Sequence, residues 1–106
     1  MRDRVLSLLG LAQKARAVAS GNFLVEQAVA KRTAKLIIIA GDAASNTRDG
    51  LEKITFHYKV PVLYYGTKET LGHALGHSER SCAAVLDEGF AKKLRELIEA
   101  GGQDQQ

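Results

Sequence analysis

The chain has 106 residues, of which 45% are hydrophobic and 25% are charged, and these fractions are ordinary for a soluble globular protein. Its length allows one domain with a single core and excludes two independent cores. No apolar run is long enough to span a membrane, and the charged N-terminal segment does not resemble a signal peptide. The lone cysteine, Cys82, excludes an internal disulfide, so we expect a cytoplasmic protein in a reducing compartment.

The net charge of +3 is unevenly distributed along the chain. Residues 1–35 include seven Lys or Arg and two acidic residues, a balance of +5, whereas the remaining residues have a balance of −2. Cations concentrated in one third of a small domain are typical of a surface that faces a polyanion. An ordinary solvated surface accounts for the charge alone equally well.

Hydrophobic spacing predicts two helices and two strands in the first half of the chain. The expected elements are a helix over residues 3–15, a strand centred on Val18, a helix over 21–32 and a strand over 36–40. Gly10, inside the first helix, indicates close packing of backbone against backbone, and Ser20 is placed to cap the second helix. The β-branched run of residues 36–40 is typical of a central strand covered on both faces.

The second half continues the alternation. Its expected elements are a helix capped near Asn46 and Thr47, a strand over 60–65, a short helix from Thr67 to Gly76, a polar loop over 77–81, a strand over 82–86 and a last helix capped by Asp87. This order predicts an α/β fold, a three-layer α/β/α sandwich with a small mixed sheet. We expect a single domain over residues 1–102 and a polar tail over 103–106.

The start of the second helix is the candidate binding site. On a helical wheel, Phe23, Gln27 and Lys31 lie opposite an apolar face that begins at Leu24. An aromatic side chain on the solvent side is unusual, and a helix N-terminus favours anions. The basic residues expected around it are Lys14, Arg16, Lys31, Arg32 and Lys35. The sequence therefore favours a nucleic-acid contact here, with packing of Phe23 under a neighbouring segment as the alternative.

Other chemistries have little support in the sequence. His73 and His77 have the spacing of two ligands on one helix face, but Gly76 is expected to end that helix and no further ligands complete a set. Cys82 begins a buried strand as a small apolar residue. We expect no catalytic residues, no metal and no cofactor.

A series of segments provides a further indication. The segments are LLGLAQKA at 8–15, SG at 20–21, AKLI at 34–37, DAASNT at 42–47, VP at 60–61, GTKETLGHALG at 66–76 and DEGFA at 87–91. Over nearly the whole chain, this ordered series resembles the bacterial YlxQ-type branch of the kink-turn-binding ribosomal proteins, relatives of L-seven-Ae and L-thirty-e. The resemblance implies an α/β/α fold and binding to an RNA kink-turn, a bent internal loop with tandem sheared G·A pairs.

The resemblance also implies where RNA binds. In that family the helix after the first strand presents its N-terminus to the bend, and a Gly-x-Asn-Glu motif with a Lys one turn later reads the G·A pairs. By position Gly21 matches the glycine, Phe23 and Leu24 replace the Asn-Glu pair, and Gln27 replaces the Lys. A family loop that covers an unstacked base matches residues 77–80.

We therefore predict a non-catalytic, RNA-binding protein that stabilises a kink-turn or similar structured RNA, ribosomal RNA included, and acts as a cytoplasmic monomer in translation. The predicted RNA-binding residues are Lys14, Arg16, Ser20, Gly21, Asn22, Phe23, Gln27, Lys31, Lys35, His77 and Arg80. Two alternatives stay open. One is a protein–protein module whose Phe23 face docks a ribosome or translation factor. The other is a small-molecule binder or enzyme that uses the sheet edge near Gly41 and Gly66.

Overall fold

The computed structural model describes residues 3–101 as alternating helices and strands. The elements are α1 (Arg4–Lys14), β1 (Val18–Ser20), α2 (Asn22–Ala30), β2 (Leu36–Ile39), α3 (Ser45–Tyr58), β3 (Val62–Tyr64), α4 (Lys68–Ala74), β4 (Cys82–Val85) and α5 (Glu88–Glu99). The sequence predicted each of these elements, with ends that differ by a few residues. The predicted tail over 103–106 lies outside the described residues.

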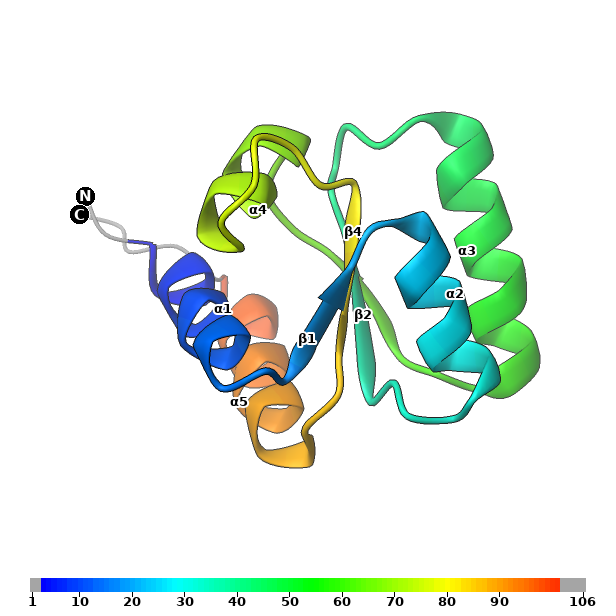
Figure 1. Cartoon of the computed structure of the whole chain (residues 1–106), viewed down its shortest axis with the longest axis horizontal. Coiled ribbons are helices and arrows are strands. Elements are labelled where there is room, and N and C mark those ends of the chain that lie inside the picture. The colour runs from blue at the N-terminus through cyan, green and yellow to red at the C-terminus, as the bar shows by residue number, and fades with distance from the viewer. Residues whose placement is uncertain (1–2, 102–106) are drawn as a thin grey trace.

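The strands form one mixed sheet in the order β1-β4-β2-β3. β4 runs antiparallel to both β1 and β2, and β2 runs parallel to β3. Helices α1, α4 and α5 cover one face of the sheet, and α2 and α3 cover the other (Figure 1). The predicted three-layer sandwich with a mixed sheet is therefore confirmed.

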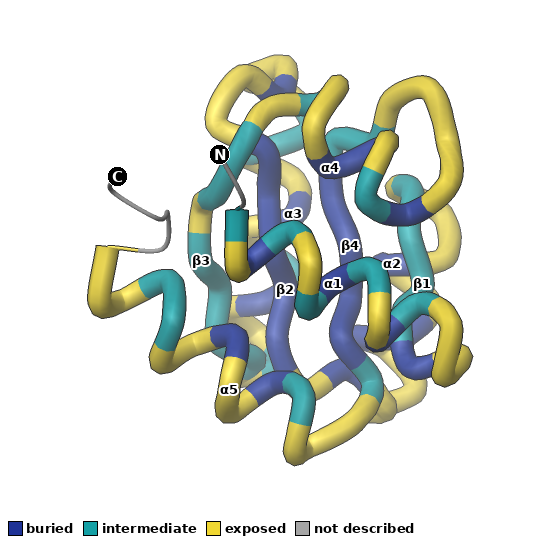
Figure 2. Tube along the Cα trace, turned by 90° about the vertical axis from the view of Figure 1, so that its left-hand side faces the viewer, coloured by how far each residue is buried: buried dark blue, intermediate teal, exposed yellow. Residues whose placement is uncertain are grey.

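The core follows the two central strands. Every residue of β2 and β4 is buried, whereas β1 and β3, at the sheet edges, are only partly covered (Figure 2). The apolar run of β2 faces a helical layer on each side, which explains why it does not alternate with polar residues. Cys82 is fully buried in this core, as its position predicted. No helix among residues 3–101 combines the length and apolar character needed to cross a membrane.

Three helices begin with a side-chain cap, and Asp87 is the one of these residues that the sequence predicted as a cap. Asp3 accepts from the Leu6 amide, Thr67 from that of Thr70, and Asp87 from that of Phe90, at 3.0, 3.1 and 2.9 Å. The predicted cap near Asn46 is wrong, because Ala44 is the N-cap of α3 and has no side chain that can accept. The Asn46 Oδ1 atom instead accepts from the neighbouring Thr47 amide.

Gly10 lies where α1 meets α4. A Cβ atom at this position would lie 3.4 Å from the Ala74 carbonyl oxygen, so the two helices approach closely here. The predicted backbone-to-backbone packing of Gly10 is confirmed.

Three helices end at a basic residue with left-handed backbone. Arg16 after α1, Arg32 after α2 and Lys59 after α3 have φ angles of 61°, 64° and 61°. A side chain in this region costs about 1 kcal/mol or more relative to glycine, because Cβ crowds the following carbonyl. The fold therefore accepts a cost at these three helix ends.

The α5 cap provides a test of the local interactions. Asp87→Ala leaves the Phe90 amide without its acceptor and should lower the free energy of unfolding by about 1 kcal/mol in a urea titration. Asp87→Ser keeps a capping oxygen and should lie close to the wild type. Equal losses in both variants would contradict a capping role.

Candidate nucleic-acid interface

The start of α2 and the loop 77–81 meet at one end of the sheet, where β1 ends and β4 begins. β1 pairs with β4 so that Ser20 lies opposite Ala83. The Gly21 amide then donates to the Cys82 carbonyl at 3.1 Å, just beyond the ladder. This pairing brings residues distant in sequence into one surface, which we call the α2-start site: Ser20, Gly21, Asn22, Phe23, His77 and Arg80.

Gly21 is the N-cap of α2 and has φ 93° and ψ 153°, a conformation that glycine adopts most readily. No side chain caps the helix start, so the predicted cap at Ser20 is wrong. The first backbone amides of α2, at Asn22 and the two residues after it, are left without a side-chain acceptor. Such a helix start presents N–H donors and the positive end of the helix dipole to a ligand.

Ser20 instead orients Arg80. The Arg80 Nε atom donates to Ser20 Oγ at 3.0 Å, Nη1 donates to the Glu79 carbonyl at 3.0 Å, and Nη2 lies 3.1 Å from His77 Nδ1. None of these partners is a carboxylate. The only ion pair among residues 3–101 joins Arg95 to Glu99, so the guanidinium charge of Arg80 is held in place without being neutralised.

Asn22 is tied to the start of β4 through one of its two polar atoms. Its Oδ1 atom accepts from the Cys82 thiol at 3.3 Å and from the Ser81 hydroxyl at 3.5 Å. Burial raises the pKa of the Cys82 thiol, which keeps this donor protonated. The amide nitrogen of Asn22 has no hydrogen-bond partner within residues 3–101 and is available to an external acceptor.

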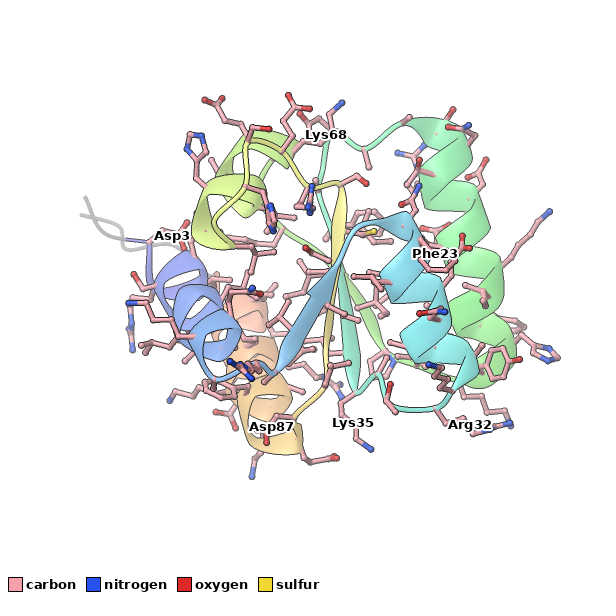
Figure 3. All side chains as sticks on the ribbon, in the orientation of Figure 1. Asp3, Phe23, Arg32, Lys35, Lys68 and Asp87 are labelled. Atoms are coloured by element: carbon pink, nitrogen blue, oxygen red, sulfur yellow. The ribbon has the colours of Figure 1, made fainter. Side chains whose placement is uncertain are left out.

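Phe23 and Leu24 form an exposed apolar pair on the first turn of α2, with 71% and 47% of their surfaces accessible. The predicted solvent position of Phe23 is confirmed (Figure 3), and its packing under a neighbouring segment is ruled out. The prediction that Leu24 belongs to the core is wrong. The buried residues of α2 begin at Val25, because the first turn follows the end of β1 and extends past the sheet edge.

Gly72 sets the position of the loop, a role that was not predicted from the sequence. A Cβ atom on Gly72 would lie 2.6 Å from Glu79 Cα and 2.7 Å from Glu79 N. The His77 amide also donates to the Gly72 carbonyl at 2.7 Å. The available signal was a glycine inside a predicted helix. Glycine lowers helix stability, so its presence there indicates that another part of the backbone packs too closely for a side chain.

The predicted basic residues do not surround the α2 start, which corrects that expectation. The Lys35 amide donates to the carbonyl of Val85, the last residue of β4, at 2.7 Å. The amide of Leu86, the next residue, donates to the Ala17 carbonyl at 2.8 Å. Arg16 and Lys35 therefore lie at the other end of the sheet from Cys82, where Figure 3 also shows Arg32. We call this opposite surface the basic edge: Lys14, Arg16, Lys31, Arg32, Lys35 and Lys59. Gln27 is exposed between the two surfaces.

The loops near Gly41 and Gly66 bond to each other. The Gly41 amide donates to the Gly66 carbonyl at 2.8 Å, and Asp42 Oδ1 accepts from the Lys68 amide at 2.8 Å. Asp42 thus serves the start of α4, and its carboxylate is engaged within the protein. Within the described part of the chain, no three His, Cys, Asp or Glu side chains gather as a metal site requires.

Gly72→Ala tests the support of the loop. The added methyl group overlaps Glu79 backbone, so the free energy of unfolding should fall by about 1–3 kcal/mol and NMR signals of residues 77–81 should shift. Gly50→Ala is the matched control, since nothing lies within 4 Å of a Cβ there and φ is not positive. It should stabilise α3 by about 0.5–1 kcal/mol. An unmoved loop in Gly72→Ala would refute the positioning role.

Residues 3–95 match the model of the ribosomal protein L7Ae/L30e/S12e/Gadd45 family. The RNA-binding protein YlxQ of Bacillus subtilis (strain 168) is 40% identical over 92 residues, which are 87% of this chain and 92% of that protein. The RNA-binding protein YlxQ of Enterococcus faecium is 31% identical over 98 residues, covering 92% and 94%.

Two solved structures are similar over most of the chain. A protein of unknown function from Bacillus halodurans C has a TM-score of 0.89 at 38% identity, with 92% of this chain and 99% of that chain covered. The Giardia lamblia 15.5kD RNA binding protein has a TM-score of 0.78 at 22% identity, covering 94% and 92%. At 22% identity, the similarity to the Giardia lamblia structure supports the fold alone.

Proposed function

The chain belongs to the ribosomal protein L7Ae/L30e/S12e/Gadd45 family, and we propose that it is a non-catalytic protein that binds RNA at a kink-turn or similar bent internal loop. It binds the folded form of this RNA and stabilises it by mass action. The names of the two YlxQ relatives, which are 40% and 31% identical, support the RNA class of ligand. We further propose that it acts as a monomer in the cytoplasm, with ribosomal RNA among its targets.

The observation that carries this proposal is the composition of the α2-start site. An exposed Phe23, an uncapped helix start and the unneutralised Arg80 lie on one surface. A bent RNA exposes bases that regular A-form helix hides, and proteins read such bases by stacking and by amide or guanidinium hydrogen bonds. The site supplies each of these: an aromatic face, an amide at Asn22 and a guanidinium at Arg80.

Recognition at this site depends on stacking more than on base-edge hydrogen bonds. The two positions that carry Asn and Glu in the resembling family hold Phe23 and Leu24, and both side chains are exposed. Apolar side chains cannot donate to or accept from a base edge, but Phe23 can stack on an unpaired base. Phosphates near the bend then take the free amides of α2 and Arg80 as donors.

A titration of the full chain with a standard kink-turn RNA tests the proposal, with a matched duplex that lacks the bulge as the control. We expect tighter binding to the kink-turn RNA, and affinity that falls steeply as salt rises. Equal, weak binding to both RNAs contradicts recognition of the bend. Salt-insensitive docking to a ribosome or translation factor through Phe23 would support the protein–protein alternative instead.

Phe23→Ala tests the stacking role. Base–aromatic stacking contributes about 1–3 kcal/mol per base, so the affinity for the kink-turn RNA should fall about tenfold or more. Phe56→Ala is the matched control, because Phe56 is another exposed aromatic, 86% accessible, on α3. Both variants should unfold at wild-type urea concentrations. A large loss of stability in Phe23→Ala with unchanged affinity would show that the ring is structural.

A further inference from the structure

The basic edge is built on an unusual set of helix ends. After α1, α2 and α3, the amides of Ala17, Thr33 and Val60 each donate to a carbonyl five residues earlier, at 2.8, 2.9 and 2.9 Å. This bond closes a turn in which the preceding residue is left-handed, a position that glycine usually holds. Here that residue is Arg16, Arg32 or Lys59.

The other two helices show the glycine solution in the same chain. α4 is followed by Gly76, with φ 81°, and the next amide donates to the Gly72 carbonyl at 2.7 Å. α5 is followed by Gly101, with φ 109°. Within residues 3–101, every left-handed position that is not glycine is therefore a cation. Long charged side chains are retained where glycine would relieve the backbone.

These three cations lie at one edge of the molecule. Figure 1 shows α1, α2 and α3 ending in the lower half of the view, where α5 begins, with α1 and α5 on one face of the sheet and α2 and α3 on the other. Hydrogen bonds confirm the adjacency: Leu86 donates to the Ala17 carbonyl, Lys35 donates to Val85, and Ile37 donates to the Pro61 carbonyl. The basic edge is thus separated from Phe23 by the length of α2, about 13 Å at 1.5 Å per residue.

A groove runs along this edge between α2, α3 and α5. Its volume is about 340 Å³, and its charged lining residues are Arg32, Lys35, Lys59, Arg95 and Glu88. Three of the four cations have no ion-pair partner among residues 3–101, and the fourth, Arg95, pairs with Glu99. The Arg32 guanidinium lies 5.2 Å from the centre of the Tyr58 ring, which orients it at the groove.

The charges of the basic edge are not satisfied within the protein. The single ion pair of residues 3–101, Arg95 with Glu99, includes none of the six residues that define the edge. The rest of the groove is lined by Tyr58 and four apolar residues, Val29, Ala34, Val60 and Pro61. The ligand that fits is a chain of phosphates, which matches several cations spaced along a surface.

We propose that the basic edge is a second RNA contact surface, which binds the phosphate backbone of a stem outside the bend held at the α2-start site. This inference rests on the proposed RNA binding. It assigns Arg32 and Lys59 to RNA contact in addition to the basic residues of the N-terminal third. The protein would then contact one RNA at two opposite edges, reading shape at one and backbone at the other.

Stabilisation of the helix ends is the competing explanation. Cations near a helix C-terminus interact favourably with its dipole, so basic residues there could serve folding alone. The two explanations differ for replacement by glycine. If the dipole accounts for the cations, glycine lowers stability and leaves RNA binding unchanged. If RNA contact accounts for them, glycine preserves or raises stability and weakens binding.

The test uses the full chain carrying Arg16→Gly and Lys59→Gly, with Arg32 kept to preserve its contact with Tyr58. Its affinity is measured against salt for a plain RNA duplex and for a kink-turn RNA with a long stem. We expect about a tenfold loss of affinity for both RNAs at low salt, and a salt slope smaller in magnitude by about two. The ratio of the two affinities should not change. The melting temperature should equal or exceed that of the wild type.

A matched control removes two exposed cations elsewhere, Arg4→Ala and Lys53→Ala, and should keep most of the wild-type salt slope. An unchanged slope in the glycine variant overturns the inference. An equal loss in the control also overturns it, because net charge alone would then explain binding. If the wild type binds both RNAs equally, the kink-turn proposal fails, while the slope on the duplex still decides the basic edge.

Discussion

The pairing of β4 between β1 and β2 is the interaction on which the rest of the structure depends. It joins the first strand of the chain to the last, and it places Gly21 beside Cys82 at one end and Ala17 beside Leu86 at the other. The two candidate surfaces lie at opposite ends of the strands of this one sheet. Every residue of β2 and β4 is buried, so the core holds the two candidate surfaces in position without a ligand.

Around this rigid sheet, the surface keeps several features that do not favour folding. Arg80 has no carboxylate partner, Phe23 exposes most of its ring, and three cations occupy left-handed backbone. Strain and unsatisfied groups of this kind collect at functional sites in proteins, where a ligand supplies what the fold does not. These features are divided between the α2-start site and the basic edge, as the proposed contact of both surfaces with one RNA requires.

The first turn of α2 departs from the pattern that the family resemblance implies. Gly21 retains the backbone conformation that opens α2, while Phe23 and Leu24 present apolar surface where hydrogen-bonding side chains are expected. Under the proposed function, a site of this composition exchanges base-edge readout for stacking and shape. Arg80, held by Ser20 and His77, then supplies charge that the first turn of α2 lacks.

The sequence by itself determined the order of elements and the three-layer architecture, because hydrophobic period and capping residues act over a few neighbouring positions. It also placed Phe23 in solvent. It did not determine that Leu24 is exposed, since a helical wheel cannot show where a helix extends past a sheet. Nor could it show that Ser20 accepts a hydrogen bond from Arg80, or that Gly72 leaves space for the backbone of Glu79. It also could not show that Arg16 and Lys35 lie at the other end of the sheet from Phe23. Those facts depend on strand order and direction, which arise from contacts between residues far apart in the chain, and only the tertiary structure decides them.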